Sequence, residues 1–160
     1  SATSVVQAPA ALASSDGSAA PSAWNTAGTF ESKNKTEWAN SRISQMFKEI
    51  KFSSFGVDIS VETIKDLEGD AEIIMNRGKK KAIYEISCTL EFEADLENET
   101  LKGELQVTDI CGDDDPECSY TFNTKPSSTG AKTKANDAMK GFIGTINKTC
   151  SDFKVAILEQ

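Results

Sequence analysis

The first stretch of the chain with a helical pattern of hydrophobic residues lies between residues 36 and 50. Thr36 stands where a helix cap would stand, and the side chains that follow recur at helical spacing: Ala39, Ile43, Met46, Phe47 and Ile50. The pattern predicts a helix from about residue 36 to residue 50. Trp38 lies beside the stripe, so we expect its ring to pack in the core.

After Phe55-Gly56 the hydrophobic period changes from helical spacing to two. Val57, Ile59 and Val61 then alternate with polar residues, which is typical of a strand with one buried face. We expect a turn at Glu68-Gly69-Asp70 and a second strand over residues 71–75.

The longest alternation in the chain runs over residues 81–93. Apolar residues occupy the even positions from Ala82 to Phe92, and Ile83 is the one apolar residue on the polar face. A polar turn over residues 95–99 leads to a fourth strand, whose predicted inward positions are Leu101, Gly103, Leu105 and Val107. A short further strand is expected over residues 119–123.

A long helix closes the chain, from about residue 131 to residue 157, after a Pro, Ser and Gly-rich stretch at residues 126–130. Its apolar stripe consists of Ala135, Met139, Phe142, Ile146, Cys150, Phe153 and Ile157. The sequence therefore predicts an α+β domain with an N-terminal helix, a four-stranded antiparallel meander, a short extra strand and a long C-terminal helix packed on the sheet.

Residues 1–22 differ from the rest of the chain, because they are rich in Ala, Ser and Pro and carry almost no charge. They predict a flexible arm, and we place one folded domain over residues 23–160. We read no signal peptide and no apolar stretch of about 18 residues, so the sequence favours a cytoplasmic protein with no membrane contact.

The formal net charge is −8, from 25 acidic and 17 basic residues. This balance disfavours nucleic acid and favours a partner that carries basic residues. The chain has no histidine, which removes the Ser–His and Cys–His nucleophile pairs and histidine-based zinc sites. We therefore expect no enzyme, no cofactor and no metal.

The four cysteines, Cys88, Cys111, Cys118 and Cys150, form no C-x-x-C pair. Free thiols are expected in a cytoplasmic protein, although Cys111 and Cys118 flank a short loop and a bridge between them stays open.

Four basic residues gather around the predicted turn Asn76-Arg77-Gly78-Lys79, which Lys80 and Lys81 follow. Glycine supplies the positive φ of a tight hairpin turn. Two interpretations are open: a solubilising hairpin tip, or a cationic probe that pairs with carboxylates or carbonyls of a partner.

Two other features invite alternatives. The acidic loop from Asp113 to Glu117 fits a solvated loop or a contact for partner lysines better than a calcium site. Trp24 and Phe30, before the first helix, fit core packing better than insertion into a partner.

Several short motifs, in this order and spacing, resemble the N-terminal domain of the activator of heat-shock protein 90 ATPase. The residues that carry the resemblance are Trp24-Asn25, Gly28 to Glu31, Trp38-Ala39, Glu68 to Ile73, Asn76 to Lys79, Tyr84-Glu85 and Gly103. It covers about residues 24–158. The family usually has an Arg where Asn76 stands, so two outcomes are open: weaker stimulation than in other members, or compensation of the lost charge by Lys80 and Lys81.

The resemblance implies a domain that binds the middle segment of heat-shock protein 90 and stimulates its ATPase by moving its catalytic loop into the active state. It matches Arg77, Gly78 and Lys79 to the partner-binding turn. It also matches Asp70 and Ile83 to further contacts and, more loosely, Asp113.

We therefore expect a cytoplasmic co-chaperone of the stress response, monomeric when free. The alternative is a small-molecule or lipid carrier with an apolar cavity between the sheet and the long helix.

Overall fold

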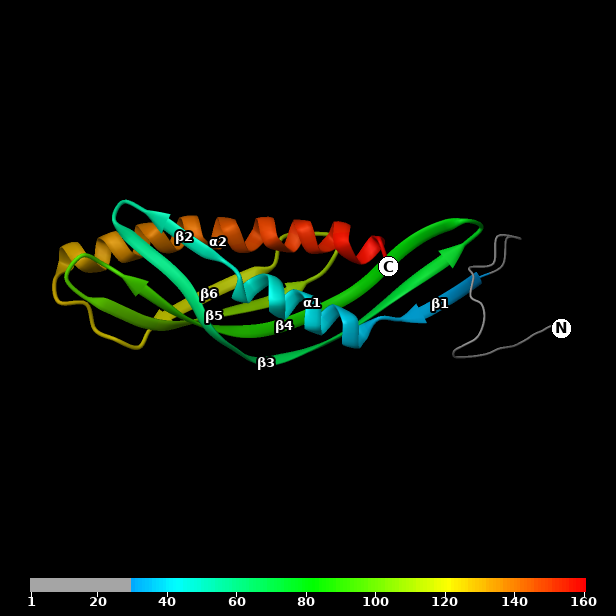
Figure 1. Ribbon diagram of the computed structural model, residues 1–160, viewed down its shortest axis with the longest axis horizontal. Helices are drawn as coiled ribbons and strands as arrows, with labels where there is room; N and C mark the ends of the chain where they lie inside the picture. Colours follow the sequence, from blue (N-terminus) through cyan, green and yellow to red (C-terminus); the bar gives the residue numbers. More distant parts are fainter. Residues whose placement is uncertain (1–29) are drawn as a thin grey trace. The chain divides into compact units, whose positions relative to one another are not determined.

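The computed structural model describes residues 30–160, as one sheet and two helices (Figure 1). The elements, in chain order, are β1 (Phe30–Asn34), α1 (Thr36–Lys48), β2 (Lys51–Ser54), β3 (Val57–Asn76), β4 (Lys79–Asp95), β5 (Thr100–Ile110), β6 (Glu117–Phe122) and α2 (Thr129–Leu158). The predicted arm, Trp24 and the expected start of the domain at residue 23 lie outside the described residues.

The described strands form one six-stranded sheet in the order β1-β3-β4-β5-β6, with β2 paired antiparallel to β3. The strands β3 to β6 follow one another in sequence order, which confirms a meander, but two of its four predicted strands, around residues 57–61 and 71–75, are parts of the single strand β3. The chain divides into two compact units: residues 74–80, at the end of the β3–β4 hairpin, belong to one together with residues 30–32, and residues 33–73 and 81–160 form the other.

The expected turn at Glu68-Gly69-Asp70 is wrong, because β3 runs through it as one 20-residue strand. Gly69 has φ +147°, and a Cβ there would lie 2.3 Å from the carbonyl oxygen of Glu85. Glycine is therefore required where β4 approaches β3 closely rather than to reverse the chain. The sequence also gave no sign of β2, whose Ser54 pairs with Val57 across a two-residue turn.

The start of α1 differs from the expected cap at Thr36. The side-chain oxygen of Asn34 accepts a 2.9 Å hydrogen bond from the Thr36 N–H. The Thr36 hydroxyl accepts a 3.0 Å bond from the Ala71 N–H and donates to the Ala71 carbonyl at 3.3 Å. Thr36 thus ties the helix to β3. The helix ends at Lys48 rather than at Ile50, although Ile50 is buried.

The predicted apolar stripe of α2 is confirmed, since all seven of its residues are buried against the sheet. Ser128 caps the helix by accepting a hydrogen bond from the Ala131 N–H at 3.1 Å. Phe142 lies 6.4 Å, between ring centroids, from Phe52 on β2. Phe153 lies 5.2 Å from Tyr84 on β4. The helix therefore packs on both of these strands.

The aromatic contacts also fix the place of α1. The Trp38 ring stacks on Phe153 at a centroid distance of 5.9 Å, as expected of a core residue. Ala39, Ile43 and Phe47 are fully buried. Both helices therefore cover one face of the sheet, as seen in Figure 1.

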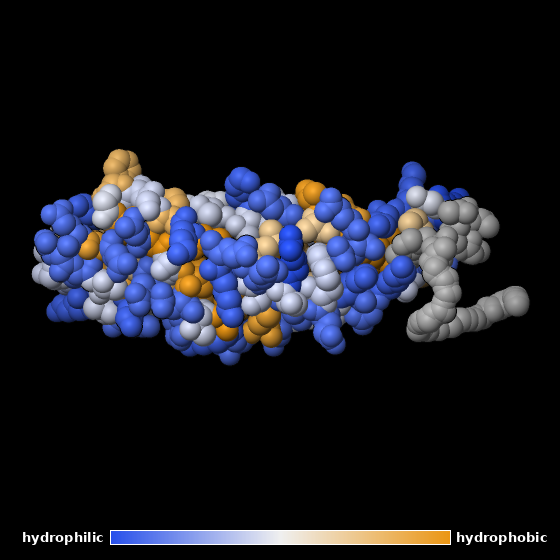
Figure 2. Space-filling view, in the orientation of Figure 1, coloured by the Kyte–Doolittle hydropathy of each residue, from blue (hydrophilic) through white to orange (hydrophobic). Residues whose placement is uncertain are grey.

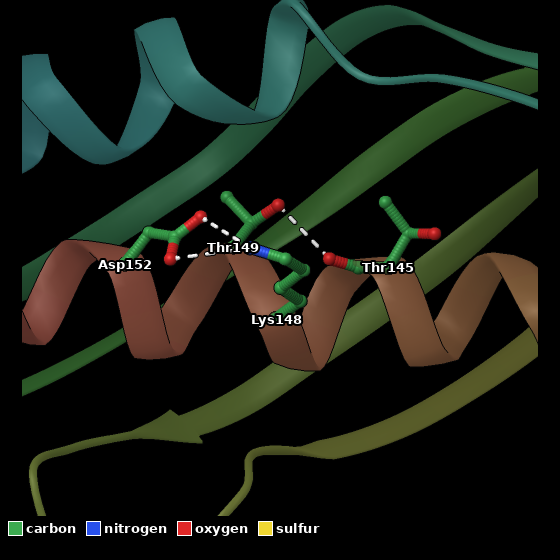
Figure 3. A network of polar contacts seen from close by, with 4 residues as sticks. All are labelled: Thr145, Lys148, Thr149 and Asp152. Atoms are coloured by element: carbon green, nitrogen blue, oxygen red, sulfur yellow. Dashed lines mark hydrogen bonds and ion pairs between the residues drawn. The ribbon is translucent and has the colours of Figure 1, made fainter.

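Figure 3 shows polar contacts along α2. The Lys148 ammonium pairs with the Asp152 carboxylate at 3.3 Å, and the Thr149 hydroxyl donates to the Thr145 carbonyl at 2.9 Å. Both residues of the ion pair are largely exposed, so the pair contributes little to stability. The helix is held by its apolar stripe. None of the described helices has the length and apolar character needed to cross a membrane.

The face of the sheet away from the helices is polar. Lys65 on β3 bonds Glu104 on β5 at 2.7 Å and Glu91 on β4 at 3.2 Å. Glu91 and Glu104 are direct cross-strand partners, so the lysine offsets repulsion between two adjacent carboxylates. These two bonds to carboxylates raise the pKa of Lys65.

All four cysteines are free thiols. Burial raises the pKa of Cys88 and of Cys150 from 9.0 to about 12, with smaller contributions from neighbouring thiols. Burial, together with the Asp115 carboxylate, raises that of Cys118 to about 11. The open question of a Cys111–Cys118 bridge is answered for this structure, in which both thiols are free.

Two glycines of α2 provide the first prediction. A Cβ on Gly141 would lie 2.4 Å from the Phe52 ring, whereas a Cβ on Gly144 would meet nothing within 4 Å. Gly144→Ala should stabilise the fold by up to about 1 kcal/mol through helix propensity. Gly141→Ala should destabilise it by about 1–2 kcal/mol by displacing the ring. Urea denaturation of both variants measures this, and equal shifts in the midpoint would contradict the packing of β2 on α2.

The buried thiols predict a loss of stability in alkali. Above about pH 9 the unfolded chain releases thiol protons that the folded chain keeps, so the free energy of unfolding falls as the pH rises. Each of Cys88 and Cys150 should contribute a slope of about 1.4 kcal/mol per pH unit up to its folded pKa. Denaturation from pH 7 to 11 measures it. Cys88→Ala with Cys150→Ala should flatten the curve, and an unchanged slope would count against burial.

Candidate functional site

The predicted basic turn is a two-residue hairpin turn between β3 and β4. Arg77 has φ +53° and Gly78 has φ +78°, the pair of positive angles found in type I′ hairpins. Gly78 thus plays the predicted role. Arg77 also adopts the left-handed conformation, which costs a side chain other than Gly or Asn about 1 kcal/mol. The turn therefore holds its arginine in an unfavourable backbone conformation.

The basic residues around the turn differ in exposure. Asn76, Arg77 and Lys79 are exposed, and so is Lys81, whereas Lys80 is half-buried. Lys81, Ile83 and Glu85 are all exposed, at alternate positions of β4. Because successive strand residues point to opposite faces, these three share the face away from α2.

Asp70 and Ile83 lie together, as members of one open groove of about 970 Å³. Its lining includes Ile83 and Glu85, which project from the face of the sheet opposite to α2. Ile83 is 45% exposed, which explains its break in the apolar alternation of β4: it faces solvent rather than the core. The structure thus brings together two of the predicted contact residues.

The charge of this groove is entirely acidic. Its lining contains no Lys or Arg and five carboxylates: Glu68, Asp70, Glu72, Glu85 and Asp109. No ion pair joins any of the five to a cation in the described part of the chain. The groove therefore favours a cationic group of a partner, with Ile83 as an apolar contact beside the charges.

The backbone of β5 is irregular beside the groove. The pairing of β4 with β5 shifts from Ile86–Ile110 to Cys88–Val107, which leaves one extra residue on β5. Asp109 in this bulge has φ +58°. Bulges bend a strand and redirect its side chains, and here they combine with the close approach at Gly69. Sequence reasoning did not assign Glu68, Glu72, Glu85 or Asp109 to a site: the first three are ordinary polar positions of β3 and β4, and the bulge at Asp109 leaves no periodic signal.

Asp113 lies elsewhere. It lines a smaller cleft of about 310 Å³ between the β5–β6 loop and α2, with Cys150, Ser151 and Lys154 on the helix side. Among residues 30–160, no group of three His, Cys, Asp or Glu side chains is placed to hold a metal ion. Asp113, which the resemblance matches only loosely, therefore lies outside the groove that contains Asp70 and Ile83.

The Tyr84-Glu85 motif divides between the two faces of the sheet. Both residues line the groove, but Glu85 is exposed there, whereas the Tyr84 side chain is buried against Phe153. Burial, with the thiols of Cys150 and Cys111 and the Asp113 carboxylate, raises the pKa of Tyr84 to about 12. Its hydroxyl lacks a hydrogen-bond partner within the described residues. One residue of the motif is therefore structural and the other belongs to the surface.

The carrier alternative finds no support in the packing. The predicted space between sheet and long helix is filled by side chains, including the fully buried Phe92, Phe142 and Phe153. Phe92 lies over its cross-strand partner Gly103, whose Cβ would be 2.6 Å from the ring. Neither described cleft lies between the sheet and α2.

The chain matches a family model described as "Activator of Hsp90 ATPase, N-terminal" over residues 32–160. The crystal structure of Aha-1 from Plasmodium falciparum is similar at a TM-score of 0.68 and 16% identity, over 80% of this chain and 88% of that one. The solution structure of the human Aha1 N-terminal domain is similar at a TM-score of 0.59 and 14% identity, over 81% of this chain and 100% of that one. No curated protein sequence matches the chain.

The left-handed conformation of Arg77 predicts that its positive charge can be removed without loss of fold stability. Asn tolerates the left-handed conformation that Arg77 adopts, so Arg77→Asn should stabilise the fold by about 1 kcal/mol while removing one charge. Thermal denaturation measures the change. Arg77→Ala provides the comparison, because alanine removes the same charge without favouring the turn. A lower midpoint for Arg77→Asn would contradict the φ of this residue.

Proposed function

This chain belongs to the family of the activator of Hsp90 ATPase N-terminal domain, and on that premise we propose that it binds the middle segment of heat-shock protein 90. In this proposal it is a co-chaperone domain, not an enzyme, and it stimulates the ATPase of its partner. The observation that carries the proposal is the family match over residues 32–160. The matched range contains the basic turn, the acidic groove and the acidic loop from Asp113 to Glu117.

In the proposal, the basic turn acts on the catalytic loop of the chaperone. Arg77 and Lys79 are exposed at the two positions that bracket Gly78. A guanidinium and an ammonium bind carboxylates and backbone carbonyls through charge-assisted hydrogen bonds. Such bonds, made to the loop only in its active position, would favour that position and so raise the rate of ATP hydrolysis.

The acidic groove has the complementary role. Its five carboxylates would pair with basic side chains of the middle segment, while Ile83 makes an apolar contact. Charges on both the turn and the groove make binding sensitive to salt. Asp113 and the half-buried Lys80 are secondary contacts in this proposal. The domain acts as a cytoplasmic monomer in the stress response.

The experiment measures phosphate release by purified heat-shock protein 90 with increasing amounts of this protein. Wild type should raise the rate, and Arg77→Asn with Lys79→Gln should lower the maximal stimulation at least tenfold, because two charge-assisted contacts are lost. The matched control, Lys132→Gln with Lys134→Gln, removes two exposed charges from the first turns of α2 and should leave stimulation unchanged.

Salt separates the electrostatic part of the effect. Wild-type affinity, measured by calorimetry, should fall between 50 and 300 mM salt, and the turn variant should show a smaller fall. An absence of binding and of any rate change with wild type would reject the function. Full stimulation by the turn variant would remove the turn from the mechanism and leave the partner in place.

A further inference from the structure

A large hydrophobic side chain projects from the β2–β3 hairpin. The turn consists of Phe55 and Gly56, and the Phe55 side chain is 86% exposed. Figure 2 shows a hydrophobic projection at the upper left, over the place where Figure 1 draws this turn. A single exposed hydrophobic residue is ordinary on a protein surface, so exposure alone indicates nothing.

The backbone of Phe55 makes it unusual. Its φ is +50°, followed by +80° at Gly56, so both turn residues adopt the left-handed conformation. A bulky residue rarely adopts it, and Asn or Gly would fill the position without strain. The sequence thus accepts both backbone strain and a ring in water at one position. Costs of this kind persist where a residue serves binding rather than folding.

The hairpin does not need the Phe55 ring in order to form. Ser53 donates a hydrogen bond to the Asp58 carboxylate, and Ser54 pairs with Val57. Phe52, three residues before Phe55, provides the packing: its ring lies against Gly141 and Phe142. Phe55 makes none of the aromatic contacts found in the described part of the chain. The hairpin is therefore held by other residues, and the Phe55 ring is left exposed at its end.

The same arrangement occurs at the other end of β3. Phe55-Gly56 precedes the strand and Arg77-Gly78 follows it, and each turn places a large side chain in the left-handed conformation before a glycine. The proposed function assigns Arg77 to the partner. A polar interface gains most of its affinity from a few aromatic or arginine anchors, and the acidic groove and basic turn contain no aromatic residue at the surface.

We propose that Phe55 is an apolar anchor that inserts into a hydrophobic pocket of heat-shock protein 90, the partner of the proposed function on which this inference rests. The ring supplies the aromatic contact of an interface whose other contacts are charged apart from the aliphatic Ile83. Because the turn already holds the ring away from the domain, little ordering is needed on binding.

Phe55→Asn tests the proposal, since Asn-Gly is a favoured type I′ pair. The variant should denature at a higher urea concentration than wild type. With heat-shock protein 90, its half-maximal concentration for ATPase stimulation should rise at least tenfold, and calorimetry should show the same loss of affinity. A ring with a purely structural role would give a less stable variant with unaltered affinity.

Two further variants make the outcome specific. Phe55→Trp keeps a large apolar ring and should keep most of the affinity. Val155→Asn removes another exposed hydrophobic residue, 61% exposed on α2, and should leave affinity unchanged. If wild type stimulates the ATPase and Phe55→Asn binds with the same affinity as wild type, this inference is overturned and the proposed function stands. Absence of wild-type binding would overturn the proposed function and this inference with it.

Discussion

The packing of the α2 apolar stripe on the sheet is the interaction on which the rest of the structure depends. Phe142 and Phe153 are fully buried and contact four rings from three other elements: Phe52 on β2, Phe92 and Tyr84 on β4, and Trp38 on α1. Burial of apolar surface on this scale is the main favourable term in folding. The contacts leave no room for a Cβ at Gly103 or Gly141. The glycines are thus consequences of close packing.

Because the helices cover one face of the sheet, the charged residues gather on the other face. With both helices on one side, the exposed positions of β3, β4 and β5 can be polar without a cost in core packing. Along much of this face, ion pairs such as Lys65 with Glu104 balance the charges. In the groove around Ile83 no lysine or arginine balances them. The contrast between balanced and unbalanced regions of one face is the physical basis for assigning the groove to a partner.

The two turns that bound β3 are the places where we propose that a side chain serves binding at a cost in stability. Each turn places a large side chain in the left-handed conformation, Phe55 in one turn and Arg77 in the other. Asn or Gly at either position would make the fold more stable. Natural proteins lie above the stability that they need, so such costs are tolerated where a side chain serves binding.

The sequence alone determined the elements whose periodicity is long. The alternation from Ala82 to Phe92 and the stripe of α2 predicted β4 and the closing helix, because regular spacing of apolar residues reports directly which face is buried. The ordered motifs around Arg77 pointed to the family. Only the tertiary structure decided that residues 57–76 form one strand, since Gly69 is explained by a carbonyl of β4. Likewise the acidic groove depends on a bulge in β5 and on cross-strand neighbours, which no local pattern encodes.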